Sequence, residues 1–263
     1  MKALLILGVA IASNCFAQNL EGYYTYSKGV YNIEDGFILQ GSTDYGGIQP
    51  NYLIDLSSDK AVREFLQYSR ELRHLPVDER VALVGDYVKN ALPHGEYDSA
   101  PYLEALEEYR NKGKAIPLKE YLRCEAGVCR ENSLFTHLGL KEAGVDNRYV
   151  YAQVEQIVNG KSYVEDHAFV VMERNGELYT VDPYNSNFDQ HRLKDVLGKE
   201  LEIGKGMAVK IRKINDYPNL YIPPEKFHPR LLTLKNPCQI LFKPAAANID
   251  ELMTKTLILQ GMF

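Results

Sequence analysis

The pair Asn175-Gly176 constrains the fold of this chain more than any other short segment. Asn-Gly is the strongest short signal for a β-hairpin, because both residues of a two-residue type I′ turn have positive φ. Apolar segments typical of strands lie on both sides of it. If Asn175 and Gly176 form the turn, Arg174 faces Glu177, and the pairing of every following residue is fixed.

This register brings two polar residues together. Phe169 then lies opposite Asp182, and side chains alternate between faces, so His167, Phe169 and Asp182 share one face. His167 and Asp182 become diagonal neighbours with Cβ atoms roughly 7–8 Å apart or closer. The sequence therefore predicts a hydrogen bond between His167 and Asp182. Asp166 is an alternative acid, but alternation points it to the face opposite from His167.

Cys129 begins a segment with helical spacing that is expected to run to Gly144, and Gly127 is expected to let the chain turn sharply into it. A thiol is nucleophilic as the thiolate, and the free N–H groups of a helix N-terminus stabilise that anion. Taken singly, Cys129, His167 and Asp182 are each more typical of ordinary packing or turns. Together, with two of them on one face, they favour nucleophilic catalysis.

The order of these three residues resembles the transglutaminase-like superfamily of cysteine enzymes. The resemblance covers roughly 81–184 and is best in Ala-Gly-Val-Cys-Arg-Glu at 126–131, in 140–150, and in the strand pair. It implies an α+β fold with a papain-like core, in which the catalytic Cys129 lies at a helix N-terminus packed on an antiparallel sheet. It implies that His167 is the base and that Asp182 orients it. The spacing also resembles bacterial glutamine deamidases. Phe169 stands where a Trp is common in relatives.

The chemistry implied is acyl transfer through a thioester at Cys129. The expected function is a cysteine-dependent hydrolase or acyltransferase that acts on peptide or glutamine side-chain amides, as a protease, a deamidase or a transglutaminase. Its partner is a protein or peptide substrate, and no cofactor is expected. The alternatives are a binding module that kept the fold and lost the chemistry, and an enzyme that cuts cell-wall stem peptides. The N–H of Cys129 is a candidate oxyanion donor, and the second donor is not identified.

The N-terminus predicts export. A basic start, a short apolar run and small residues at Cys15 and Ala17 are typical of a signal peptide cut after Ala17, with lipid attachment at Cys15 as the second choice. We therefore expect a secreted or periplasmic protein, and no later segment is long and apolar enough to span a membrane. Of the cysteines that remain, Cys124 pairs with Cys238 or, less favoured, with Cys129.

Domain boundaries follow from shifts in composition. We expect a signal peptide at 1–17, a Tyr-rich extension of short strands at 18–57, a catalytic core at 58–200, and a C-terminal extension packed on the core at 201–263. Further expected elements are two helices within 58–92, a helix at 101–110, strands at 148–154, 168–173 and 178–182, an extended proline-rich segment past 216, and a last strand at 256–259.

The net charge and the spacing of the His and Gly residues argue against a nucleic-acid-binding protein, a metal site and a phosphate-binding loop. The formal net charge is -5 and the sequence pI is about 5.8, so no basic footprint for nucleic acid is present. The other histidines lack the spacing of a metal site, and only His191 rivals His167 as a base. The glycines at 198–206 do not have the spacing of a phosphate-binding loop, and a turn between strands is expected there.

Overall fold

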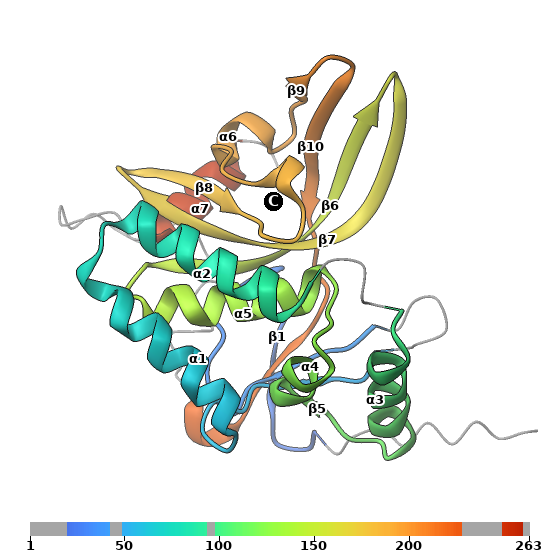
Figure 1. Cartoon of the computed structure of the whole chain (residues 1–263). Coiled ribbons are helices and arrows are strands. Elements are labelled where there is room, and N and C mark those ends of the chain that lie inside the picture. The colour runs from blue at the N-terminus through green and yellow to red at the C-terminus, as the bar shows by residue number, and fades with distance from the viewer. Residues whose placement is uncertain (1–19, 43–48, 94–97, 228–248, 260–263) are drawn as a thin grey trace, which may run out of the picture.

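The computed structural model describes residues 20–42, 49–93, 98–227 and 249–259, and these form an α+β fold, as predicted (Figure 1). The helices are α1 (Lys60–Glu71), α2 (Val77–Ala91), α3 (Ala100–Asn111), α4 (Leu118–Cys124), α5 (Cys129–Glu142), α6 (Leu193–Val196) and α7 (Ile249–Leu259). Short 3-10 helices are η1 (Leu72–His74), η2 (Ser186–Phe188) and η3 (Pro224–Lys226). The strands are β1 (Tyr24–Tyr26), β2 (Val30–Tyr31), β3 (Ile38–Leu39), β4 (Tyr52–Leu53), β5 (Ile116–Pro117), β6 (Asn147–Val158), β7 (Lys161–Arg174), β8 (Glu177–Val181), β9 (Leu201–Gly204), β10 (Met207–Ile214) and β11 (Leu220–Ile222).

A curled antiparallel sheet with the strand order β8-β7-β6-β10-β9 forms the centre of the molecule, and β2 also pairs with β6. The predicted turn is confirmed, because Asn175 and Gly176 have φ of 55° and 76° and Arg174 pairs with Glu177. A second Asn-Gly turn at 159–160 joins β6 to β7, and these two strands extend well beyond the segments predicted from the sequence. The register of β7 against β8 is therefore the one that the hairpin signal implied.

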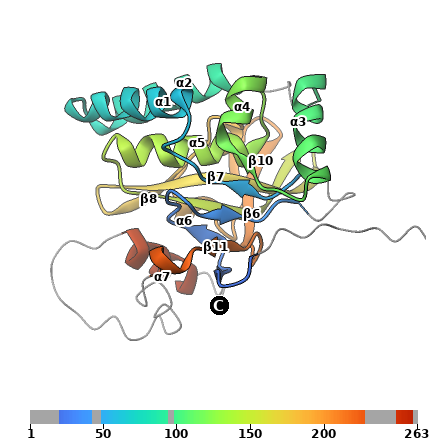
Figure 2. The same cartoon turned by 90° about the horizontal axis from the view of Figure 1, so that it is seen from below.

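Helices cover both faces of this sheet. Figure 2 shows α5 between the sheet and the pair α1 and α2, with α7 on the other side of the sheet. The large core lies on the α5 side and includes Phe65, Val84, Phe135, Tyr149 and Val170. The second core includes Val150, Phe169, Phe188, Ile211 and Met253. Because residues of opposite parity along β6 and β7 fill the two cores, the sheet is buried on both faces.

The two flanks of the predicted core contribute strands of their own. A smaller sheet with the order β1-β11-β3-β4-β5 combines strands from the first part of the described chain with β11 near its end. Beyond residue 200, β10 pairs with β6 along most of its length, inside the central sheet. The flanks therefore supply strands to both sheets, and the domain boundaries stay predictions.

Two elements differ from the expectations. The segment predicted as a strand at 256–259 lies in helix α7, so that prediction is wrong. Ile249, Met253 and Leu257 recur at intervals of four and are buried in the second core, which only a helix allows. Helix α4 was not predicted; it begins after Pro117, which is a common residue at a helix start. The signal peptide and Cys238 lie outside the described residues.

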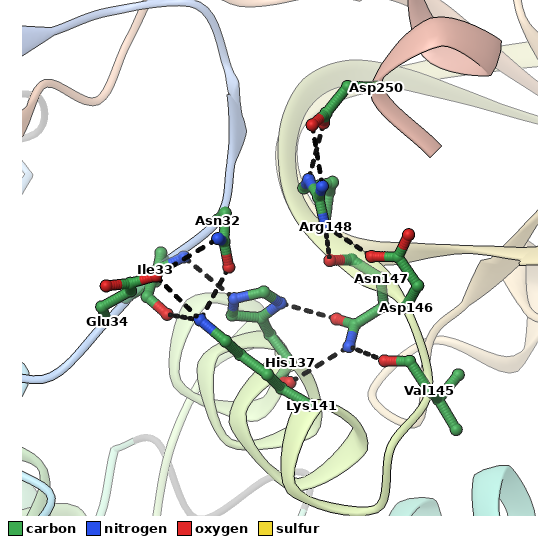
Figure 3. A network of polar contacts seen from close by, with 10 residues as sticks. All are labelled: Asn32, Ile33, Glu34, His137, Lys141, Val145, Asp146, Asn147, Arg148 and Asp250. Carbon is green, nitrogen blue, oxygen red and sulfur yellow. Dashed lines mark hydrogen bonds and ion pairs between the residues drawn. The ribbon is translucent and has the colours of Figure 1, made fainter. Parts of the chain in front are cut away.

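A polar network ties the N-terminal flank to α5 and β6 (Figure 3). His137 is fully buried in the middle of α5. Its Nδ1 contacts Asn147 Oδ1 at 2.6 Å, and its Nε2 accepts the N–H of Ile33 at 3.0 Å. Lys141 donates to Asn32 and to the carbonyl of Ile33. These contacts hold the second half of the helix that begins at the candidate nucleophile.

Candidate active site

Cys129 is the first residue of α5, as predicted, and its side chain is partly buried. The carboxylate of Glu131 accepts the N–H of Val128 at 2.7 Å and caps the helix start. Gly127 is needed here for space, because a Cβ at this position would lie 2.9 Å from Cβ of Glu131. The positive φ in this loop belongs to Glu125, at 50°, so the sharp turn expected at Gly127 occurs two residues earlier.

His167 and Asp182 form the predicted hydrogen bond. Nε2 of His167 donates to Oδ2 of Asp182 at 2.5 Å, and both side chains are buried, with 2% and 0% exposed. The ring of His167 also packs against Phe169, Tyr184 and Phe188. With Nε2 committed to Asp182, Nδ1 is the nitrogen left to face the nucleophile.

The segment after β8 holds Asp182 in place. Oδ1 of Asp182 accepts the N–H groups of Tyr184 and Asn185. The N–H of Asp182 donates to the carboxylate of Asp189 at 2.9 Å. Since its two oxygens serve different partners, the carboxylate has one orientation, and the oxygen that meets His167 is fixed.

Cys129 and His167 are also within hydrogen-bonding reach of each other. Burial by itself disfavours the charged imidazolium, but the Asp182 carboxylate and the Cys129 thiol outweigh that effect and raise the pKa of His167 well above its usual value. The direction of this shift favours the charged imidazolium. The three predicted site residues are therefore brought together in an arrangement suited to a thiolate and imidazolium pair.

A cluster of tyrosine side chains around Arg130, the residue after Cys129, was not predicted from the sequence. Arg130 is buried at 3% exposure and its guanidinium packs over the rings of Tyr52, Tyr151 and Tyr217. Tyr52 donates to Glu131 at 2.8 Å. The only signals for this cluster were the richness in Tyr of the N-terminal flank and the Arg beside Cys129, and neither specifies a contact.

The residues considered as alternatives to His167 and Asp182, and the second cysteine, make other contacts. Nε2 of His191 donates to the carbonyl of Asn187 in the loop after β8. Asp166 is exposed and accepts from Asn215, as its opposite orientation predicts. Cys124 is a free thiol in the structure, as is Cys129, and the S–H of Cys124 donates to the carbonyl of Pro101. The pairing of Cys124 with Cys238 stays a prediction.

Two further observations concern ligands and membranes. Among the described residues, no group of three or more His, Cys, Asp or Glu could hold a metal ion.

A cavity of about 250 Å³ lies beside α2 and the segment after β8, and its lining includes Lys89, Pro183 and Asp189. No helix in the described ranges has the length and apolarity that a bilayer crossing needs.

Comparison with known proteins adds no assignment. No protein-family model matches the sequence, and no curated protein matches it significantly. The interpretation of the site therefore rests on its geometry, and the transglutaminase-like resemblance stays a prediction.

Proposed function

We propose that this protein is a cysteine-dependent hydrolase or acyltransferase of the transglutaminase-like, papain-like class. The observation that carries the proposal is the chain of contacts from Cys129 through His167 to Asp182, which joins a thiol at a helix start to a buried imidazole and a buried carboxylate. Each group has the chemical type and the partner that nucleophilic catalysis requires. The substrate class is a peptide amide or a glutamine side-chain amide.

In the proposed reaction, His167 carries each proton that is transferred. His167 takes the proton of the Cys129 thiol, and the sulfur attacks the carbonyl carbon of the amide to form a tetrahedral intermediate. The imidazolium of His167 gives its proton to the leaving amine or ammonia as the C–N bond breaks, which leaves a thioester on Cys129. His167 then removes a proton from water or an acceptor amine, which attacks the thioester and releases acid or a new amide with the free thiol. Asp182 orients the ring and stabilises its charged form.

Two features of the start of α5, one backbone donor and the polarity of the helix, support stabilisation of the tetrahedral intermediate. The backbone N–H of Cys129 belongs to the first turn of α5, where N–H groups have no partner within the helix. It lies next to the sulfur that forms the new bond. Helix polarity favours negative charge at the same position. This donor is available without any rearrangement of the chain.

Export remains part of the proposal and rests on the sequence of residues 1–17 alone. A protein with this leader is expected in a secreted or periplasmic location. The cell-wall stem peptides considered above are then an accessible substrate, besides peptides and proteins.

Purified protein incubated with a glutamine-rich protein and with cell-wall peptide tests the proposal. Ammonia release without chain cleavage indicates deamidation, new amide cross-links to an added amine indicate transglutamination, and new peptide termini indicate proteolysis. All three depend on the thioester, so Cys129→Ala abolishes each of them. Cys124→Ala is the matched control and retains activity. Absence of all three activities, together with no acyl adduct on Cys129 by mass spectrometry, supports the binding module instead.

A further inference from the structure

Strand β7 is covered by β8 over only part of its length. The ladder between the two strands ends at the pair Val170 and Val181, whereas β7 itself begins at Lys161. Residues 161–169 therefore lie at the edge of the central sheet, with β6 as their partner on one side. No other described strand pairs with this edge. Figure 1 shows the tip of the β6–β7 hairpin extending away from the helices.

The end of β8 explains why the edge is open. Asp182 turns its N–H to the carboxylate of Asp189. Continuation of the register would place Pro183 opposite Ala168, and proline has no N–H to donate. The chain therefore leaves β7 where the next ladder bond would form. His167 lies within the uncovered part of β7, so the open edge leads directly to the proposed active site.

The pairing of β6 shows which main-chain groups of β7 point outward. The N–H of Tyr151 donates to the carbonyl of Gly29 at 2.7 Å, and its carbonyl accepts the N–H of Asn215 at 3.0 Å. Both groups of Tyr151 thus turn away from β7, where its partner is Ala168. Ala168 belongs to a pair without mutual hydrogen bonds, so its own N–H and carbonyl point away from β6. By alternation, the same holds for Ser162, Val164 and Asp166.

This edge has the properties of a template for an added strand. None of the outward N–H and carbonyl groups at Ser162, Val164 and Asp166 has a partner among the described residues. The side chains of residues 161–166 are exposed on both faces of the hairpin, with Tyr163 at 57% and Val164 at 43%. A row of free main-chain donors and acceptors pairs with an extended chain of another molecule.

Two neighbouring carboxylates on the edge indicate the charge of the partner. Glu165 accepts from the amide of Gln156 and Asp166 from the amide of Asn215, and neither acid forms an ion pair within the described structure. They follow each other, so they project to opposite faces. An added strand alternates in the same way, and two successive basic residues place one cation beside each carboxylate. Lys161, the one cation of the exposed segment, lies at its far end from His167.

We propose that the substrate is an extended peptide that adds a strand to the edge of β7 at 162–166, with two successive basic residues beside Glu165 and Asp166. The proposal rests on the proposed function, because it names the substrate of the same site. A strand rises about 3.3 Å per residue. The peptide residue three places beyond the one opposite Val164 is therefore level with His167. Main-chain pairing then delivers the following amide to the reacting groups.

Amide hydrogen exchange of the isotope-labelled Cys129→Ala protein, which cannot turn a peptide over, tests the proposal. In the free protein we expect slow exchange at Tyr163 and Glu165, whose N–H groups face β6. Fast exchange is expected at Val164 and Asp166. The probes are two nine-residue peptides of Thr and Val with one Gln, carrying Lys-Lys before or after it. A bound strand slows exchange at Val164 and Asp166.

Variants separate main-chain pairing from side-chain contact. Val164→Pro removes one outward N–H and keeps the bonds to β6, since proline is accepted on an edge strand. We expect peptide binding about threefold to tenfold weaker, the loss of one typical hydrogen bond. Val164→Ala keeps the N–H and is the matched control, expected to bind like the parent protein. The double variant Glu165→Gln and Asp166→Asn weakens binding of the Lys-Lys peptides by about twofold to fivefold per charge and leaves Ser-Ser versions unchanged.

A scan of single N-methyl groups along the peptide requires no variant of the edge. Alternate N–H groups of an added strand face β7, so we expect weakened binding at every second position. A scan without this period, or no binding by any of the peptides, overturns the proposal. Slow exchange at Val164 and Asp166 in the free protein also overturns it, because the edge is then already covered. Equal affinity for Lys-Lys and Ser-Ser peptides overturns the assignment of a basic pair.

The proposed function fails or stands separately. Wild-type protein that forms an acyl adduct on Cys129 with these peptides, but shows no period of two, keeps the function and refutes the added strand. Binding with a period of two and no acyl adduct refutes the function and supports a binding module that uses the same edge.

Discussion

His167 and Asp182 are joined by a 2.5 Å hydrogen bond although the strand ladder that positions them stops at the pair Val170 and Val181. Asp182 is the first residue past β8, and its N–H donates to Asp189 instead of to β7. Strand β8 therefore places the Asp182 carboxylate next to the imidazole of His167. Hydrogen bonds to the loop that follows β8 fix the orientation of the carboxylate. This relationship underlies the first prediction.

Replacement of Asp182 by Asn lowers the pKa of His167 towards its usual range. The carboxylate is the main attraction that offsets burial of the charged ring, so its loss favours the neutral imidazole. In the wild type the imidazolium persists until the pH rises through the elevated pKa, and in the variant it is lost at lower pH. NMR titration of the imidazole measures the shift. Asp166→Asn is the matched control, because this neighbour faces away, and an equal shift there contradicts the account.

Replacement of Glu131 by Ala destabilises the protein by about 1–3 kcal/mol. The carboxylate accepts the N–H of Val128 and the hydroxyl of Tyr52. The variant removes the side-chain acceptor of the Val128 N–H, and it leaves the Tyr52 hydroxyl with Gln49 as its remaining acceptor. Urea denaturation measures the free energy of unfolding. Glu104→Ala on the exposed face of α3 is the control and is expected to change stability by less than about 0.5 kcal/mol. A loss of similar size in both variants would show that the cap has no special role.

Acid destabilises the fold through His137. Burial lowers its pKa to about 3, against an ordinary value of 6.5, so the folded state keeps the ring neutral while the unfolded chain takes up a proton. This contribution is complete above about pH 6.5 and falls with pH by roughly 1.4 kcal/mol per unit towards the folded pKa. Unfolding by urea at several pH values measures it. His137→Gln flattens this dependence, whereas the exposed His74→Gln leaves it unchanged; identical slopes in all three proteins refute the assignment.

The hairpin turn tolerates no side chain with a branched Cβ at its second position. Gly176 has a φ of 76°, and Gly176→Val is expected to cost about 1–2 kcal/mol. Gly204→Ala is the matched control, since Gly204 lies outside the left-handed region and a Cβ there meets nothing within 4 Å. Thermal unfolding compares the two variants, and equal melting temperatures would show that the turn does not require Gly176.

Local signals allowed much of this fold and site to be predicted. The Asn-Gly turn fixed a register, and a register of period two fixes which side chains meet, so the bond between His167 and Asp182 followed without coordinates. Helix α5 was predicted because its apolar residues recur with helical spacing and it ends before a Gly with positive φ.

Long-range contacts could not be predicted in this way. Arg130 meets Tyr52 and Tyr217, which come from opposite flanks of the chain, and no periodicity relates residues so far apart. Helix α7 was predicted as a strand because a short apolar run is compatible with either a strand or a helix. The packing of its residues in the second core shows that it is a helix. The parts of the site that depend on the flanks therefore required the structure.

The most direct test of the account is the alkylation of Cys129 and Cys124 by iodoacetamide near pH 6 in one sample, resolved by peptide mapping. The two thiols are matched in being partly buried, but burial raises the pKa of Cys124, which lacks an imidazole partner in the described structure. The account predicts that Cys129 reacts at least about tenfold faster, and that His167→Ala removes the difference. Equal, slow labelling of both thiols in the wild type would contradict it.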